Sequence, residues 1–266
     1  MDARLRSGSG SSIAAVACSL ALLAFLALLV SGPGHRLGLW TFGTGFALLR
    51  WAAYLGIAAV LVALAGLLMP RARRSPAAVA GEPARTTLRR SHAGNWLLAA
   101  ALLVGAVVAA VPLYWLQVAG SAPPIHDITT DTDDPPAFVA VAPLRAQAPN
   151  LADYGGAEVA AAQRQAYPEI GPTRLPVAPA DAWQRALRAA RDMGWELVGE
   201  DQAAGRIEAT ATTRWFGFRD DVVVRVRPDG TGSRIDVRSV SRVGQGDVGT
   251  NARRIEAYQA RLIAQG

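Results

Sequence analysis

The sequence predicts an N-terminal all-α transmembrane region of three helices, followed by a C-terminal α+β domain with an antiparallel sheet and helices on one face. Three apolar stretches within residues 1–118 are each long enough to cross a bilayer core of about 30 Å. Between residues 195 and 240, apolar and polar residues alternate with a period of two, which is typical of half-buried strands. The composition agrees, because only 18% of residues are charged, below the roughly 25% of a typical soluble domain.

The candidate spans are residues 13–30, 45–69 and 95–118. The first ends at Ser31-Gly32-Pro33-Gly34 and the second at Pro70, and both signals interrupt an apolar helix. Because Arg4 and Arg6 precede the first stretch, it could instead be a cleaved signal peptide. No clear small-x-small cleavage site follows it, so an uncleaved span is favoured.

The arginines predict the orientation of these spans. Two arginines precede the first span, Arg36 lies between the first and second, Arg50 lies about one turn inside the outer end of the second, and six lie between the second and third. Positive residues near span ends stay in the cytoplasm. We therefore expect a cytoplasmic N-terminus and a periplasmic or otherwise extracytoplasmic C-terminal domain. All 27 positive residues are Arg, a bias of GC-rich bacterial genomes, so the expected location is a bacterial inner (plasma) membrane, crossed several times.

Several function classes are excluded by composition. Residues 1–118 carry a net charge of +8 and residues 119–266 a net charge of −2, so the folded domain lacks the basic surface of a nucleic-acid-binding protein. The single Cys18 allows neither an intramolecular disulfide nor a cysteine metal cluster. No Ser-His-Asp arrangement can be drawn, because the three histidines (35, 92 and 126) lie outside the domain. We assign no catalytic residue, metal or cofactor.

Residues 119–150 are rich in proline and aspartate and are expected to form an extended linker between the anchor, residues 1–118, and the domain, residues 151–266. His126, Asp127 and Asp131 have a spacing that is a weak signal for a metal site. A solvated loop, or a strap laid along the domain, is the favoured interpretation.

The domain itself is expected to be a four-stranded meander with helices on one side. A helix over 179–193 places Trp183, Leu187 and Ala190 on one face. The remaining predicted elements are a helix over 155–165, strands over 195–200, 205–213, 221–227 and 234–240, and a final helix over 250–264. Such alternation gives the sheet one covered face and one polar face.

The glycine loop before the last helix is the densest polar segment. Gly244, Gly246 and Gly249 match the Gly-x-Gly-x-x-Gly pattern of dinucleotide sites. That fold needs a further parallel strand and an acidic residue about twenty positions on, and this sequence offers neither. Asp247 would also place a negative charge where phosphates should bind, so a nucleotide site is not expected.

Two interpretations of the polar residues in this segment remain open. Arg238, Arg242 and Arg254, together with loop amides, could hold a small anion such as a phosphate or carboxylate headgroup. Alternatively, Asp247 pairs with these arginines and Asn251 locks the loop to the sheet, which makes the set structural. In both cases the loop is expected to be rigid.

Asp220 and Asp221 resemble a catalytic carboxylate pair, but neighbours on a strand point to opposite faces and cannot share a proton or a metal. One of them is expected to pair with Arg219, Arg225 or Arg242. The aromatic turn formed by residues 215–218 is interpreted as a core plug rather than as the lip of a binding site.

A family resemblance rests on the segments 216–222, 236–244 and 247–255, in which Arg238 to Gly244 read Arg-Ser-x-Ser-Arg-x-Gly. Over about residues 121–265 the chain resembles the domain of unknown function 1499 family, and residues 125–131 with Pro135-Pro136 resemble the opening segment of its membrane-anchored members. The Asn-Cys motif of other members is missing. The resemblance implies no activity, and it draws attention to Asp220, Asp221, Arg238, Ser241, Arg242, Asp247 and Asn251.

These observations predict an integral membrane protein whose extracytoplasmic domain binds an envelope lipid, a cell-wall component or a membrane protein without catalysis. The alternative is an envelope hydrolase or transferase that uses Asp220, Asp221, Asp247 and Ser241. A third possibility is a scaffold that organises other membrane proteins through its spans. Besides the lipid bilayer, the expected partners are such envelope molecules, and nucleic acid is not among them.

Overall fold

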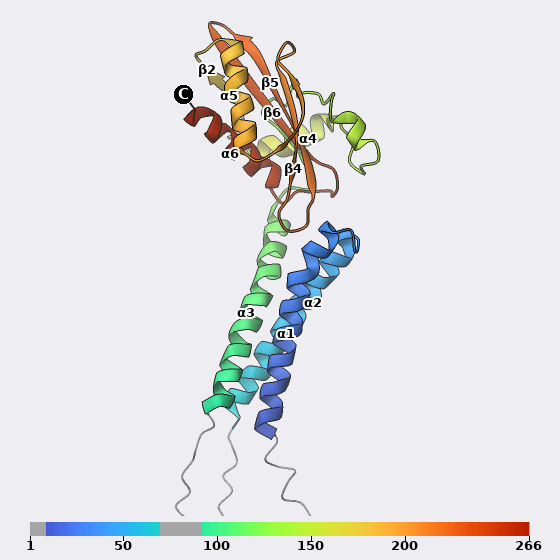
Figure 1. The fold of residues 1–266 in the computed structure, drawn as a ribbon, viewed down its shortest axis with the longest axis vertical. Coiled ribbons are helices and arrows are strands. Elements are labelled where there is room, and N and C mark those ends of the chain that lie inside the picture. Colours follow the sequence, from blue (N-terminus) through green and yellow to red (C-terminus); the bar gives the residue numbers. More distant parts are fainter. Residues whose placement is uncertain (1–8, 70–91, 266) are drawn as a thin grey trace, which may run out of the picture. The chain divides into compact units, whose positions relative to one another are not determined.

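The computed structural model describes residues 9–69 and 92–265 (Figure 1). The chain divides into two compact units, Met1–Gln117 and Val118–Gly266, which are described separately.

Three helices in the described residues are long and apolar enough to cross a membrane. They are α1 (Ser9–Arg36), α2 (Phe42–Leu68) and α3 (His92–Ser121). α1 continues beyond the break expected after residue 30 and contains Pro33. A proline is tolerated in a membrane helix because neighbouring groups satisfy the backbone that it frees. In the turn before Pro33, the hydroxyl of Ser31 donates to the carbonyl of Leu28 at 2.7 Å.

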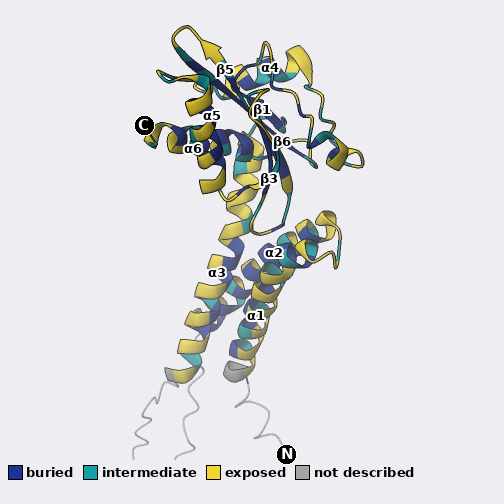
Figure 2. Cartoon of the chain, turned by 45° about the horizontal axis from the view of Figure 1, so that its top comes forward, coloured by how far each residue is buried: buried dark blue, intermediate teal, exposed yellow. Residues whose placement is uncertain are grey.

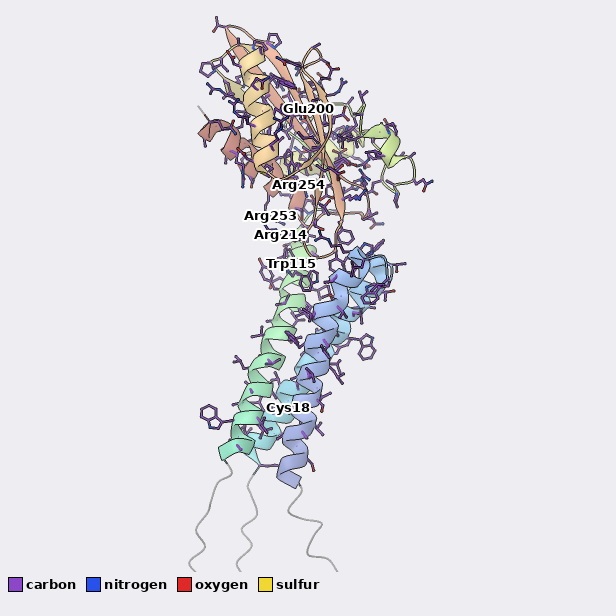
Figure 3. All side chains as sticks on the ribbon, in the orientation of Figure 1. Cys18, Trp115, Glu200, Arg214, Arg253 and Arg254 are labelled. Carbon is purple, nitrogen blue, oxygen red and sulfur yellow. The ribbon has the colours of Figure 1, made fainter. Side chains whose placement is uncertain are left out.

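Small residues allow α2 and α3 to approach closely. A Cβ added to Gly56 would lie 2.7 Å from the carbonyl oxygen of Gly105, and one added to Gly105 would lie 2.8 Å from that of Gly56. Such contacts are characteristic of helix packing in membranes. Cys18, labelled in Figure 3, is half-buried on α1. The arginines of the N-terminus and of the loop between the second and third spans lie outside the described residues.

The C-terminal unit is an α+β domain, as the sequence predicts, but its antiparallel sheet has six strands rather than four. The order is β1-β6-β5-β4-β3, and β2 also pairs with β6. The elements are β1 (Asp127–Thr129), the 3-10 helix η1 (Ala142–Arg145), α4 (Gly156–Ala166), β2 (Thr173–Leu175), α5 (Pro179–Asp192), β3 (Glu196–Asp201), β4 (Arg206–Thr212), β5 (Arg219–Asp229), β6 (Gly232–Ser241) and α6 (Thr250–Ala264). β1 and β2 have three residues each, too few to show a period-two pattern.

The hydrophobic core lies between one face of the sheet and the helices α5 and α6 (Figure 2). Val222 and Val224 of β5 and Val237 of β6 point to this face and are at most 1% exposed. Tyr258 of α6 is fully buried, and its hydroxyl donates to the carbonyl of Ala186 on α5 at 2.9 Å. This bond joins the two helices above the sheet.

Residues 119–150, expected as an extended linker, are part of this folded unit. They include the end of α3, β1 and η1, and Val141 is completely buried. We call residues 131–154 the strap, because they cover the sheet face opposite α5 and α6. The polar face that the sequence predicts is therefore not left to solvent. The prolines of the strap prevent a helix, but they do not prevent close packing.

Acidic and amide groups attach the strap to the sheet. The buried carboxylate of Glu208 on β4 accepts hydrogen bonds from the backbone N–H groups of Val139, Ala140 and Val141 at 2.9–3.0 Å. Asp131 of the strap forms ion pairs with three arginines of β5 and β6: Arg225, Arg227 and Arg234. The face is thus closed mainly by charge-assisted hydrogen bonds.

Only a few residues connect one end of the sheet to α3, and we call it the α3 end. β1 begins six residues after α3 ends, and the start of β1 lies beside the end of β6. β4 ends and β5 begins at this same end. The loops 213–218 and 242–249 therefore lie together there. The latter contacts the segment that leaves α3, because the N–H of Asp247 donates to the carbonyl of Ile125 at 3.3 Å.

Replacing Glu208 by Gln is expected to loosen the strap. The substitution presents an amide N–H to backbone donors and removes the charge, at a cost of about 1–3 kcal/mol. Hydrogen exchange of the amides at residues 139–141 in the full-length protein should accelerate about tenfold or more. Glu200→Gln, at an exposed glutamate on β3, is the control and should leave these amides unchanged. Equal exchange in the two variants would show that Glu208 does not hold the strap.

Candidate functional site

The most deeply buried charges lie on the strap side of β5. The carboxylate of Asp221 is inaccessible to solvent and accepts hydrogen bonds from Arg145 at 2.7 Å, from Arg242 at 2.8 Å and from the hydroxyl of Thr210 at 2.7 Å. The expected pairing of one of the two adjacent aspartates with Arg242 is present. Arg145, which the sequence analysis did not identify, also donates to the backbone carbonyls of Val240 and of strap and β6 residues.

These bonds determine the protonation of Asp221. Burial raises the pKa of its carboxyl group, but the hydrogen bonds from Arg242, Thr210 and Arg145 outweigh burial and hold the pKa below its ordinary value of 3.8. The group is therefore a carboxylate at neutral pH. Its lone pairs are engaged by guanidinium and hydroxyl donors, so it is poorly placed to accept a substrate proton.

Asp220 points to the opposite face and belongs to a second cluster under α6. Its carboxylate pairs with Arg254 at 2.5 Å. The guanidinium of Arg254 also donates to the hydroxyl of Ser239 and to the side-chain oxygen of Asn251. The amide of Asn251 donates to the hydroxyl of Ser241 at 3.0 Å and to the carbonyl of His126 at 2.9 Å. Asn251 thus locks α6 to the sheet, as one of the two interpretations of the sequence requires.

Asp247 does not pair with the arginines, contrary to that same interpretation. Among the described residues no guanidinium lies within 4 Å of its carboxylate. Instead it accepts the backbone N–H groups of Gly249 at 2.9 Å and Asn251 at 2.5 Å, which makes it the cap of α6. Burial raises the pKa of Asp247, and the two backbone hydrogen bonds offset only part of this effect. The glycine loop reaches the helix through Val248 and Gly249, both at positive φ.

These hydrogen bonds occupy backbone N–H groups at the start of α6 that an anion would need. The N-terminus of a helix attracts anions because its first N–H groups lack partners. Here Asp247 provides the negative charge itself.

Each of the three arginines predicted to be able to hold a small anion is paired with a carboxylate. Arg254 pairs with Asp220 and Arg242 with Asp221, as described above. Arg238 pairs with Asp127 of β1 at 2.7 Å and is 2% exposed. Its guanidinium also lies over the rings of Phe138 and Tyr154. The candidate residues thus fall into three ion-pair groups: one under α6 and two beneath the strap.

A hollow of about 310 Å³ opens beside the first turn of α6. Its lining residues are Met193, Gly194, Trp195, Ala211, Thr212, Thr250, Arg253 and Arg254. Figure 3 labels Arg253 and Arg254 at this position. Arg253 is exposed, and among the described residues no carboxylate lies within 4 Å of its guanidinium. Sequence reasoning missed Arg253, because nothing in its local pattern separates it from Arg254.

The described residues contain no group of three His, Cys, Asp or Glu side chains that could hold a metal ion. The lining of the hollow offers cationic, hydroxyl and aromatic groups, which suit the binding of an anion.

Replacing Asp221 by Asn tests the ion-pair cluster. Asn resembles the protonated acid but leaves two arginines without their carboxylate, so we expect a loss of about 3–5 kcal/mol of unfolding free energy at pH 7. Because the folded-state pKa is lowered, the stabilisation by Asp221 is present above the unfolded pKa and disappears as the pH falls through the folded pKa. Urea unfolding of the full-length protein in detergent, followed by near-ultraviolet circular dichroism, should show the two proteins converging below about pH 4.

The control is Asp229→Asn, at an exposed ion pair with Arg174, which should change stability little at any pH. A constant difference between Asp221→Asn and the unmodified protein from pH 7 to pH 3 would contradict the assignment.

Comparison with known proteins places these features in a family. The model described as "Protein of unknown function (DUF1499)" matches residues 127–262, just over half of the chain. No curated protein matches the sequence. The crystal structure of TTHA0849 from Thermus thermophilus is similar at 12% identity, with a TM-score of 0.23, and the match covers 36% of this chain and 97% of that one. The family match extends from β1 through α6, and on this basis the chain belongs to the DUF1499 family.

Proposed function

We propose that this protein is a non-enzymatic, membrane-anchored binding protein whose domain holds an anionic envelope ligand in the hollow beside α6. The observation that carries the proposal is a contrast between arginines. Those of the ion-pair groups are neutralised by aspartates. Arg253 lines the hollow with no carboxylate within 4 Å among the described residues, and its guanidinium donates to the carbonyl of Val248 at 3.1 Å.

The contacts of the acidic residues favour binding over catalysis. Asp220 and Asp221 lie on opposite faces of β5, and each is bonded to at least one arginine. Asp247 caps a helix, and the hydroxyl of Ser241 accepts a hydrogen bond from Asn251. A hydrolase needs a base within reach of a nucleophile or water. None of these groups forms such a pair with another.

The lining of the hollow indicates the chemistry of the ligand. A guanidinium binds phosphate and carboxylate oxygens through paired N–H donors. The hydroxyls of Thr212 and Thr250 can add hydrogen bonds, and Trp195 supplies an apolar wall. Arg254 is held rigidly by Asp220, so it contributes donors but little net charge. A phosphate-bearing or carboxylate-bearing headgroup of a lipid or cell-wall fragment fits this set.

The location of the protein completes the proposal. Three helices long and apolar enough to span a membrane precede the domain. The distribution of arginine along the sequence supports a cytoplasmic N-terminus and a domain outside the cytoplasm, in a bacterial inner membrane. A domain placed there meets lipid headgroups and cell-wall material.

Replacing Arg253 by Ala tests the hollow. Titration calorimetry of the full-length protein in neutral detergent, with glycerol phosphate and with carboxylate-bearing muropeptides as probes, should detect binding of at least one of them. Losing a charge-assisted contact costs about 1.5–3 kcal/mol, so Arg253→Ala should weaken that binding about tenfold or more.

The matched control is Arg261→Ala, an exposed arginine two turns further along α6. It should bind the probe as the unmodified protein does. If neither probe binds at millimolar concentration and crosslinking in cells recovers no partner, the proposal fails. Conversion of a probe to product would support the alternative hydrolase instead.

The orientation is tested by thiol labelling in intact cells. In a Cys18→Ala background, Thr231→Cys introduces one cysteine into the exposed turn between β5 and β6. A membrane-impermeant maleimide should label it without cell lysis once any outer membrane is permeabilised. Labelling that appears only after the inner membrane is opened would place the domain in the cytoplasm.

A further inference from the structure

The loop between β4 and β5 is a closed, rigid turn at the α3 end of the sheet. The N–H of Thr213 donates to the carbonyl of Phe218 at 2.8 Å, and the N–H of Gly217 donates to the carbonyl of Thr213 at 3.0 Å. The N–H of Phe218 also donates to the hydroxyl of Thr213 at 2.8 Å. The rings of Phe216 and Phe218 stack with centroids 5.2 Å apart. A loop with this many internal contacts holds its outer side chains in fixed positions.

The outer side chains of this loop are aromatic and basic. Phe216 is buried, whereas Trp215 next to it is 43% exposed. Arg214 and Arg219 are exposed on either side of Trp215. No acidic residue lies between Glu208 and Asp220. Tryptophan and arginine together are the side chains that favour the boundary between lipid and water.

The length of the connection limits how far this end of the sheet can lie from the membrane. Tyr114 and Trp115, near the end of α3, are an aromatic pair of the kind found at membrane interfaces. From Trp115 to the end of α3 the helix rises about 9 Å. The five residues 122–126 then lead to β1 and span at most about 18 Å when fully extended. The α3 end of the sheet, which carries the loop, is thus tethered within reach of the lipid headgroups.

We propose that the loop 213–219 docks on the surface of the same membrane that α3 crosses, with Trp215 among the headgroups and Arg214 and Arg219 against the phosphates of anionic phospholipids. The charge of the loop is complementary to such a surface. The tether makes the contact intramolecular, so a weak affinity is sufficient. This docking does not depend on the ligand proposed for the hollow.

Spin labelling of the full-length protein in lipid nanodiscs tests the docking. In a Cys18→Ala background, one nitroxide is placed at Trp215→Cys and, in a separate protein, at Thr231→Cys at the opposite end of the sheet. A third protein carries the label at Gln245→Cys, an exposed site at the α3 end that leaves Trp215 in place. Relaxation by oxygen and by a water-soluble nickel complex then reports the environment of each label.

With about one third anionic phospholipid, the label at 215 should be protected from nickel and accessible to oxygen, and the label at 245 should be partly protected. The label at 231 should be accessible to nickel throughout. In neutral lipid, protection at both sites should fall. It should also fall with Arg214→Gln and Arg219→Gln, and each substitution should lower the ratio of docked to undocked protein about fivefold. The charge-matched control, Arg174→Gln with Arg261→Gln, should leave protection unchanged.

Two outcomes would overturn the docking. Equal nickel accessibility at 215, 245 and 231 in anionic lipid would mean that the loop stays in water. A label at 215 shielded from both reagents, to the same extent in neutral lipid and in detergent micelles, would mean that the loop packs against protein. Neither outcome changes the calorimetric result at Arg253, so this proposal and the proposed function can fail separately.

Discussion

The carboxylate–guanidinium pairs between the strap and the sheet are the interaction on which the domain depends. The main hydrophobic core lies on the α5–α6 face. The other face carries charged side chains at most positions, beside a small apolar cluster of Phe138, Val141, Val223 and Val240. Burying such charges is costly unless each meets a partner and its remaining donors and acceptors are bonded. Asp221 shows the solution: two arginines and one hydroxyl satisfy its carboxylate, and Arg145 in turn bonds to four backbone carbonyls.

Bonds of the same kind hold the α3 end of the sheet at several points. Arg242, which leads into the glycine loop, is held by Asp221, and Asn251, at the start of α6, is held by residues of β6 and by the carbonyl of His126. The loop between these two residues is therefore fixed at both ends, and Asp247 caps the helix that follows. Arg253 and Arg254 project from a helix turn that has little freedom to move. A preformed hollow loses less entropy on binding than one that must first be ordered.

The sequence predicts those parts of the fold that depend on local pattern, and misses those that depend on partners far along the chain. The strands β3 to β6 and the helices α4 to α6 appear at their expected places, because their residues alternate or recur at helical spacing. Residues 131–154 carry no such pattern, since several of their polar groups are bonded to strands about 70 to 100 positions away. Arg145 is an example: nothing near it in the chain identifies Asp221, 76 residues later, as its partner. Asp247 lies two residues before the N-cap Gly249, so its bond to the N–H of Asn251 comes from outside the usual capping position.

The candidate site was predictable only in part for a related reason. The polar residues of β5, β6 and α6 are recognisable from the sequence, but whether an arginine binds a ligand or an aspartate depends on three-dimensional pairing. Arg254 and Arg253 are adjacent and both line the hollow, yet Arg254 pairs with Asp220 whereas Arg253 has no carboxylate within 4 Å among the described residues. A single uncompensated guanidinium binds an anion weakly in free solution. At a membrane surface, where headgroups are locally concentrated and the α3 tether restricts the domain, the same contact needs no high intrinsic affinity. The modest hollow and the three apolar helices are therefore consistent with the proposed binding of an anionic headgroup.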